Sequence, residues 1–288
     1  MDKPLPELTA RNIPTAQQEA LSVQPPSLYG GPESAFRLAF TDTDFLLREE
    51  LRPVRMQLEL LKPELVQQEQ GIKSTIVIFG SARIASFEDA TTQLAAARAT
   101  DNPQALRVAE SALAMSHFYE EARRFAALVT ERSRALPTPI YVVTGGGPGI
   151  MEAGNRGAFD VGGKSIGLNI VLPHEQAPNE YVTPDLCFNF HYFAIRKMHF
   201  LMRARAICVF PGGFGPLDEM FESLTLIQTG RMKPVPFLLF GRAYWEKILN
   251  WQALAEAGVI SEKDLSLFKF VETAEEAVAA IDAWPRVD

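Results

Sequence analysis

The fold is decided by two stretches of similar design, IYVVTGGGPGIME at residues 140–152 and AICVFPGGFGPLDE at residues 206–219. In each, an apolar run typical of a buried strand leads into a glycine-rich turn, and a helical pattern follows. Glycines let an anion approach the backbone closely, and the start of a helix offers N–H groups without partners. Two such turns in one α/β domain predict a phosphate in the crevice at the carboxyl ends of neighbouring strands. Tight turns without a ligand are the alternative, which the repetition of the design disfavours.

The composition is that of an ordinary globular protein of 288 residues, with 47% hydrophobic and 22% charged residues. The net charge of −7 argues against nucleic acid or an anionic membrane as a partner. The two cysteines, Cys187 and Cys208, give neither a disulfide framework nor a repeated metal-ligand pattern. Without a signal-peptide core or a long apolar run, the chain is expected to be a soluble protein of the cytoplasm.

The chain is expected to have two parts, an N-terminal arm with a helical extension over residues 1–70 and a catalytic α/β domain over residues 71–288. Residues 1–34 are rich in proline and polar residues and predict a loose arm. From residue 36 to about residue 70, apolar residues recur at helical spacing. We expect helices here that are interrupted near Pro53 and Pro63.

Strand-like and helix-like segments alternate over the second part. The expected strands cover residues 75–79, 140–144, 165–172, 206–210 and 235–239. Between and after them we expect two helices within residues 86–136, divided around Asp101-Asn102-Pro103, and helices near residues 149–159, 192–203, 217–229 and 244–254. This alternation predicts an α/β fold with a doubly wound parallel sheet covered by helices on both faces.

Several familiar chemistries do not fit the motifs. The first turn lacks the Gly-Lys-Ser/Thr ending of a Walker A loop and the GxGxxG spacing of a dinucleotide fingerprint. His191 and His199 have no carboxylate or cysteine at ligand spacing, which disfavours a metal site. No GxSxG elbow marks a serine hydrolase, and no lysine stands in a recognisable Schiff-base context.

A basic pair, Arg196-Lys197, lies on the expected helix just before the second glycine turn. A solvated basic patch is the usual interpretation of such a pair. Here Phe193, Ile195 and Met198 flank it, so a buried arginine with a specific role is also open. Arginine can bind a phosphate through two parallel hydrogen bonds and stays charged in a protein site.

Together the motifs GGGPGIMEAGNRGA, Arg196-Lys197, PGGFGPLDE and LIQTGRMKPVPFLLF resemble the Lonely Guy family, whose members are often labelled lysine decarboxylases. The resemblance covers about residues 75–251, and the FGSAR stretch at residues 79–83 and the N-terminal extension resemble the longer bacterial branch. It implies a Rossmann-like fold, homodimers or larger assemblies, and hydrolysis of nucleoside 5′-monophosphates such as AMP or cytokinin ribotides to free base and ribose 5-phosphate. The family's catalytic pair falls on Arg196 and Glu219.

Two departures from the family pattern bear on function. Pro216 stands where the family's PGGxGT turn has threonine, which removes a hydroxyl and an N–H. Phe193-Ala194 replaces the Met-His of the shorter plant-like proteins, so base recognition is expected to differ. The alternative to an enzyme is therefore a non-catalytic nucleotide-binding protein or a carrier similar to molybdenum-cofactor carriers. A regulatory enzyme whose N-terminal helices gate the site is a third alternative.

The predicted site has Arg196 and Glu219 as catalytic residues, with no metal and no cofactor, and its expected partner is a nucleoside 5′-monophosphate. Glu222 lies one turn beyond Glu219 and is either an assisting carboxylate or a surface acid. The residues expected to bind substrate are Gly80, Ser81, Gly146, Gly147, Gly149, Ile150, Lys197, Gly212, Gly213, Phe214, Gly215 and Pro216.

Overall fold

The computed structural model describes residues 14–23, 26–31, 33–173 and 177–285. The chain divides into two compact units, Met1–Leu58 and Glu59–Asp288. The predicted boundary near residue 70 stays a prediction. Within the described residues, no helix combines the length and the apolar character that a membrane span requires.

The N-terminal unit consists of short, exposed elements. It contains the helices α1 (Ala16–Ser22) and α2 (Thr43–Leu46), the 3₁₀ turns η1 (Ser27–Tyr29) and η2 (Glu49–Leu51), and the first residues of α3 (Arg52–Glu69). Residues 16–22 of the expected arm form the helix α1, because Thr15 and Gln18 form a reciprocal capping box that starts it. That the arm is loose stays a prediction. The first 13 residues of the predicted arm lie outside the described residues.

Helix α3 corrects one sequence prediction. Pro53 lies in its first turn, where a missing N–H is tolerated, so the break expected there is confirmed. Pro63 lies inside the helix and does not end it. Proline leaves the carbonyl four residues earlier, that of Glu59, without its helical donor. The ring nitrogen Nε2 of His199 lies 3.2 Å from this oxygen and takes the place of that donor.

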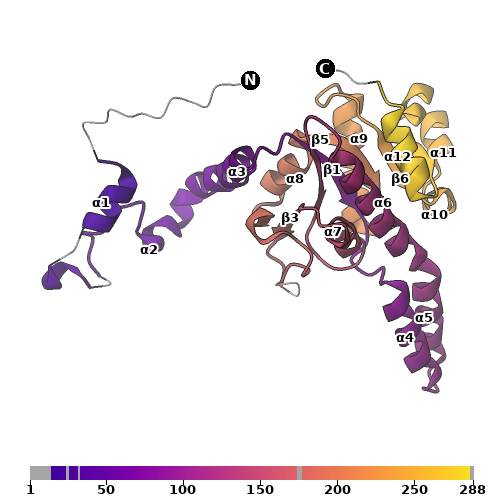
Figure 1. The fold of residues 1–288 in the computed structure, drawn as a ribbon, viewed down its shortest axis with the longest axis horizontal. Helices are drawn as coiled ribbons and strands as arrows, with labels where there is room; N and C mark the ends of the chain where they lie inside the picture. The colour runs from indigo at the N-terminus through magenta and orange to yellow at the C-terminus, as the bar shows by residue number, and fades with distance from the viewer. Residues whose placement is uncertain (1–13, 24–25, 32, 174–176, 286–288) are drawn as a thin grey trace. The chain divides into compact units, whose positions relative to one another are not determined.

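The second unit is built on one parallel sheet of seven strands in the order β4-β3-β2-β1-β5-β6-β7 (Figure 1). The strands are β1 (Ser74–Phe79), β2 (Ile140–Thr144), β3 (Ser165–Ile170), β4 (Cys187–Phe190), β5 (Ala204–Val209), β6 (Phe237–Phe240) and β7 (Lys269–Val271). The five predicted strands are all present. The two missed strands, β4 and β7, have four and three residues and are too short to give a clear periodicity.

Helices cover both faces of the sheet, as predicted. Ile76 and Ile78 of β1 belong to the apolar core that includes side chains of α6, α7 and α12. Successive strand residues point to opposite faces, so the side chain of Phe79 lies on the other face of the sheet. There it packs edge-on against Phe200 of α8, with 4.9 Å between the ring centroids. The doubly wound α/β fold is therefore confirmed.

The helices of the second unit follow the predicted order with three differences. They are α4 (Phe87–Arg98), α5 (Pro103–Met115), α6 (His117–Ser133), α7 (Ile150–Asp160), α8 (Phe193–Met202), α9 (Phe214–Gln228), α10 (Arg242–Ile248), α11 (Trp251–Glu256) and α12 (Ala274–Asp282), with 3₁₀ turns η3 (Pro184–Leu186) and η4 (Glu262–Ser266). Residues 87–133 form three helices instead of two, because the chain turns at Ser116 between α5 and α6. The single helix expected over residues 244–254 is divided at Asn250, whose side chain caps α11, and α12 was not predicted.

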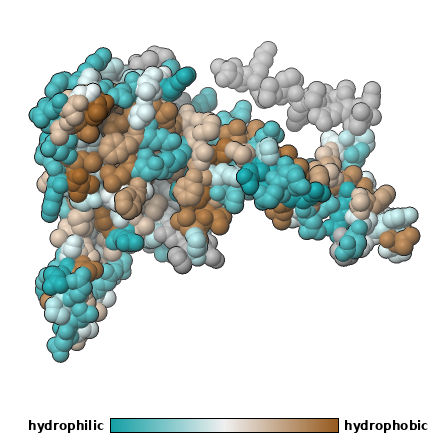
Figure 2. All heavy atoms as spheres, turned by 180° about the vertical axis from the view of Figure 1, so that it is seen from behind, coloured by the Kyte–Doolittle hydropathy of each residue, from teal (hydrophilic) through white to brown (hydrophobic). Residues whose placement is uncertain are grey.

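Helices α4 and α5 pack against each other, and their surface is largely hydrophilic in the view of Figure 2. None of the predicted site residues lies on them. Apolar side chains gather instead on the body of the second unit in that view.

Candidate functional site

The two glycine turns meet beside Ser81, just beyond the carboxyl end of β1. The N–H of Ser81 donates to the carbonyl of Pro211 at 3.1 Å, and its own carbonyl accepts the N–H of Ile150 at 3.1 Å. Gly80 lies so close to the Ile150 side chain that a Cβ there would collide with it. Because β1 lies between β2 and β5, the turns that follow these strands are placed on either side of it. The juxtaposition expected from the sequence is therefore present.

The first turn is closely surrounded by protein atoms. Gly146 and Gly149 have φ angles of +72° and +68°, which L side chains rarely adopt. A Cβ at Gly149 would lie 2.5 Å from the carbonyl oxygen of Ser81. At Gly145, a Cβ would lie 2.6 Å from the guanidinium of Arg196. Glycine is thus required here by backbone conformation and close approach.

A buried polar network, which the sequence analysis missed, holds the first turn. Thr144 accepts the N–H of Gly146 at 2.9 Å and donates to Asn155 at 2.7 Å. The side chain of Asn179 donates to the carbonyls of Gly146 and Gly147 at 3.0 and 2.9 Å, and to Asn155 at 3.0 Å. Asn155 stands within the quoted motif GGGPGIMEAGNRGA, so its position was a signal. Asn179 lies 33 residues from Gly146 with no motif around it.

The second turn is more open. Gly212 is packed against the Pro216 ring, and its carbonyl accepts the hydroxyl of Tyr244 at 2.9 Å. A Cβ at Gly213 or Gly215 would meet nothing within 4 Å. Between these two glycines, Phe214 is 94% exposed. Space for a ligand is therefore found at Gly213 and Gly215.

The hydrogen bonds decide which N–H groups an anion can use. Those of Gly146 and Ile150 already donate to Thr144 and Ser81. Among the described residues, no acceptor is found for the N–H groups of Gly147, Gly149, Gly212, Gly213, Phe214 and Gly215. Pro216 is the third residue of α9 and offers no N–H. The anion-ready groups are thus fewer than the sequence predicted, but they lie on both turns.

Helix α8 brings the basic pair to these turns. The Nε of Arg196 donates to the carbonyl of Leu168 on β3 at 2.6 Å, and its Nη2 lies 3.5 Å from that of Gly145. Its guanidinium carbon also lies 5.2 Å from the ring centroid of Phe200. Arg196 is therefore held in place against the first turn, unlike an arginine of a solvated patch.

Lys197 forms ion pairs with two carboxylates of α9, those of Asp218 at 2.7 Å and Glu222 at 2.9 Å. Burial acts to lower the pKa of Lys197, but the neighbouring carboxylates raise this pKa by more, so the net shift is upward. Lys197 thus stays charged, and Glu222 is part of the cluster instead of an isolated surface acid.

Glu219 lies one turn into α9, half-buried beside this cluster. Burial raises the pKa of its carboxyl to about 7, although the positive charges of Lys197 and Arg196 act in the opposite direction. A carboxyl with a pKa near neutrality can exchange a proton with a reacting molecule at physiological pH. Among the residues described, Glu219 is therefore well suited to acid–base chemistry at this site.

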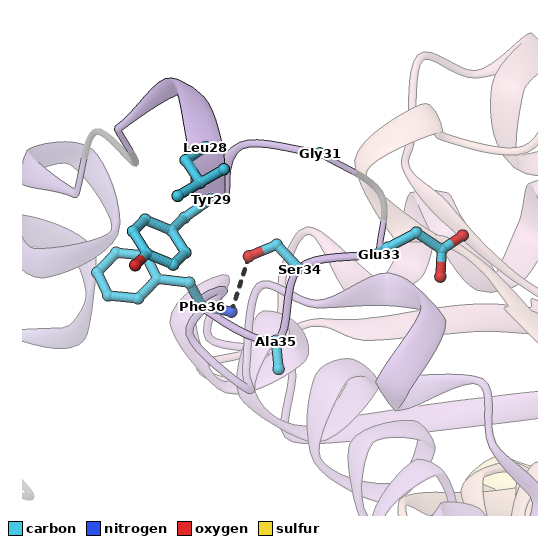
Figure 3. Close-up of a pocket in the computed structure, with 7 residues that line it drawn as sticks. All are labelled: Leu28, Tyr29, Gly31, Glu33, Ser34, Ala35 and Phe36. Carbon is cyan, nitrogen blue, oxygen red and sulfur yellow. Dashed lines mark hydrogen bonds between the residues drawn. The ribbon is translucent and has the colours of Figure 1, made fainter.

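Other candidate sites are weaker. No group of three or more potential metal ligands occurs within the part of the chain that the structure describes. Cys208 is fully buried, and burial raises the pKa of its thiol. In the N-terminal unit, a shallow hollow contains none of the predicted site residues (Figure 3). It is lined by Leu28, Tyr29, Gly31, Glu33, Ser34, Ala35 and Phe36.

Several solved structures are similar to this chain at low identity. The molybdenum cofactor binding protein from the phototrophic bacterium Rippkaea orientalis is 16% identical with a TM-score of 0.46, and the match covers 73% of this chain and 96% of that chain. A structural genomics target is 17% identical with a TM-score of 0.45, covering 73% and 99%. The Moco carrier protein from Chlamydomonas reinhardtii is 15% identical with a TM-score of 0.42, covering 73% and 96%. Likeness at this level says nothing about activity.

Sequence comparison is informative for the second half of the molecule. No curated protein matches the chain. Residues 151–281 match the family model described as "Possible lysine decarboxylase". This segment contains the Arg196-Lys197 pair and the whole second glycine turn with Glu219. Over this segment, the chain is therefore similar to the lysine-decarboxylase-like family, the Lonely Guy-like family that the motifs resemble.

Proposed function

We propose that this protein hydrolyses the N-glycosidic bond of nucleoside 5′-monophosphates, giving a free base and ribose 5-phosphate. One observation carries the proposal. The two glycine turns are joined through Ser81, and the basic pair Arg196-Lys197 lies beside them, close to the half-buried carboxyl of Glu219, whose pKa is raised to about 7. A phosphate site with an acid–base group beside it suits a reaction on a phosphorylated molecule. Homo-oligomeric assembly and a role in cytokinin biosynthesis belong to the same proposal and rest on the resemblance alone. A cytoplasmic location is also proposed, from the sequence pattern described above.

In the proposed mechanism, the 5′-phosphate binds the N–H groups of Gly147, Gly149, Phe214 and Gly215, with the charge of Arg196 nearby. This contact is remote from the bond that breaks, and it orients the ribose for reaction. As the C–N bond breaks, positive charge develops on the ribose, as in glycoside hydrolysis.

Glu219 acts on this developing charge in its ionised form. The carboxylate stabilises the cationic ribose and accepts a proton from the water whose oxygen bonds to the anomeric carbon. The electron pair of the C–N bond leaves with the base, which takes up a proton. Arg196 balances the charge of the phosphate or of the departing base, and Lys197 pairs with Asp218 and Glu222 of α9.

The Glu219→Gln variant tests this proposal. It keeps the shape of the side chain but removes its charge, so base release from AMP should fall by about 10²–10³-fold while nucleotide binding persists. The matched control is Glu256→Gln, an exposed acid on α11 outside the site. Release by Glu219→Gln at the wild-type rate would remove Glu219 from the mechanism.

The pH dependence gives a second test. Since the pKa of Glu219 in the ligand-free protein is raised to about 7, its carboxylate forms as the pH rises through 7, and kcat/KM should fall below that pH. This acidic limb should be absent from the residual activity of Glu219→Gln. A limb near pH 4.5, the ordinary value for glutamate, would contradict the raised pKa.

A panel of nucleoside monophosphates and their nucleosides would identify the substrate class. Monophosphates should be cleaved far better than the matching nucleosides, because the nucleoside leaves the anion-ready N–H groups without a partner. AMP against adenosine at equal concentration is the simplest pair. Tight binding of monophosphates without any base release would favour a carrier over an enzyme.

A further inference from the structure

The helix that carries Arg196 and Lys197 is held along its length by the part of α3 that belongs to the second unit. At its start, the carboxylate of Glu59 accepts the N–H groups of His191 at 2.8 Å and Tyr192 at 3.1 Å. Tyr192 is the N-cap of α8, and its own side chain makes no capping bond. Glu59 thus supplies, from 132 residues away, the acceptor and negative charge that favour a helix N-terminus.

The middle of α8 is held by the backbone of the same residue. Pro63 frees the carbonyl of Glu59, and Nε2 of His199 bonds to that oxygen at 3.2 Å. His199 is 3% exposed, so this contact gives a buried ring nitrogen its partner. Burial lowers the pKa of His199, which favours the neutral ring in this position.

The end of α8 is held by an ion pair. Arg203, its C-cap, binds the two carboxylate oxygens of Glu64 at 2.8 and 2.7 Å, and its Nε donates to the carbonyl of Ile72. The Arg203 side chain is 11% exposed, and such bidentate pairs are geometrically specific. Three separated contacts therefore fix the position of α8 along its axis.

We propose that Glu59 is a positioning residue for the proposed reaction: through α8, it keeps Arg196 and Lys197 beside the glycine turns and Glu219. This inference rests on the proposed function. The charged groups that act on Glu219 are Lys197 and Arg196 from α8 and Asp218 and Glu222 from α9. If α8 shifts, the two positive charges move away while the two negative charges stay on the helix of Glu219.

The experiment uses the full chain with Glu59→Gln, and with Glu69→Gln as the matched control. Glu69 is an exposed acid at the end of the same helix, and among the described residues its side chain forms no hydrogen bond or ion pair with α8. Glutamine keeps one acceptor oxygen but loses the charge, so the fold should persist while the start of α8 loosens. Glu59→Ala removes both acceptors and should change every readout further in the same direction.

Two readouts are taken together. Hydrogen exchange of the amides at residues 191–196 should become about tenfold faster in Glu59→Gln than in wild type or Glu69→Gln. The acidic limb of the pH profile of kcat/KM for base release from AMP should move to higher pH by about half a unit or more, because the positive charges that move away are those that lower the pKa of Glu219.

The outcomes separate the two proposals. No base release from wild type defeats the proposed function, while the exchange data still report whether Glu59 holds α8. The positioning role is supported if the wild-type protein releases base and the acidic limb of the pH profile moves in Glu59→Gln but not in Glu69→Gln. Faster exchange with an unmoved limb makes Glu59 a structural contact only and overturns the inference, as does unchanged exchange.

Discussion

The first glycine turn, residues 145–150, and the second, residues 212–216, have similar sequences but are surrounded very differently. At the first turn, a Cβ on Gly145, Gly146 or Gly149 would collide with protein atoms. At the second, only Gly212 is confined, and Gly213 and Gly215 face open space. The glycines of the first turn therefore allow close packing against neighbouring protein atoms, while Gly213 and Gly215 of the second turn leave open space beside the backbone.

This difference assigns separate tasks to the turns. The first is fixed by Thr144, Asn155 and Asn179 and presents a preformed backbone. The second leads directly into α9, which carries the carboxyl of Glu219. Substitutions in the first turn should mainly change stability, and substitutions in the second should mainly change ligand binding and turnover.

The largest effect is expected from Gly149→Ala. Its φ of +68° and the nearby carbonyl oxygen and backbone of Ser81 and Ala82 leave no room for a methyl group. The free energy of unfolding should fall by about 3–5 kcal/mol, measured by urea denaturation. Gly258→Ala is the control, because Gly258 has a φ of +71° but no atom within 4 Å of the added Cβ. Equal losses in the two variants would show that close approach contributes nothing.

The network that holds the first turn gives the next effect. Asn179→Asp replaces the donor that bonds the carbonyls of Gly146 and Gly147 with an acceptor. The unfolding free energy should fall by about 1–3 kcal/mol, and the KM for AMP should rise because the turn loses its shape. Asn179→Ala, which removes the bonds without adding charge, should have the milder effect. A KM that stays at the wild-type value in both variants would separate this network from ligand binding.

These contacts show where prediction from sequence succeeds and where it stops. Strand β2 and the first turn could be predicted because the apolar run, the glycines and the start of the helix follow one another within 13 residues, at positions 140–152. Asn179 could not, since nothing local marks it as the partner of a turn 33 residues earlier. The prediction of a helix break at Pro63 was wrong for the same reason. The missing N–H of Pro63 leaves the carbonyl of Glu59 without a donor, and the donor that replaces it, His199, is 140 residues from Glu59. Local patterns thus predicted the strands and turns, and long-range polar partners decided the rest.

A smaller effect, confined to the ligand, is expected from Gly215→Ala. Gly215 is the second residue of α9, where the helical backbone suits alanine, and the added methyl group meets nothing, so stability should stay within about 1 kcal/mol of wild type. The methyl group would occupy the space through which an anion approaches this backbone, and the KM for AMP should rise by about tenfold or more. The cleavage rate of adenosine, which has no phosphate, should change little. Unchanged KM for AMP would mean that the phosphate does not approach the second turn.

The smallest effect is expected from Pro216→Thr. This substitution restores the threonine of the family's usual turn and adds an N–H and a hydroxyl at the third residue of α9. Phe214 and Gly215 already offer N–H groups there, so kcat/KM for AMP should change by no more than about threefold. Stability should change by less than about 1 kcal/mol, since threonine mainly loosens the unfolded chain. Pro216→Ala adds the N–H alone, and comparison of the two variants isolates the hydroxyl. If wild type released no base from any monophosphate while Pro216→Thr released it readily, the proline would mark a binding protein, and the open second turn would be a ligand site without catalysis.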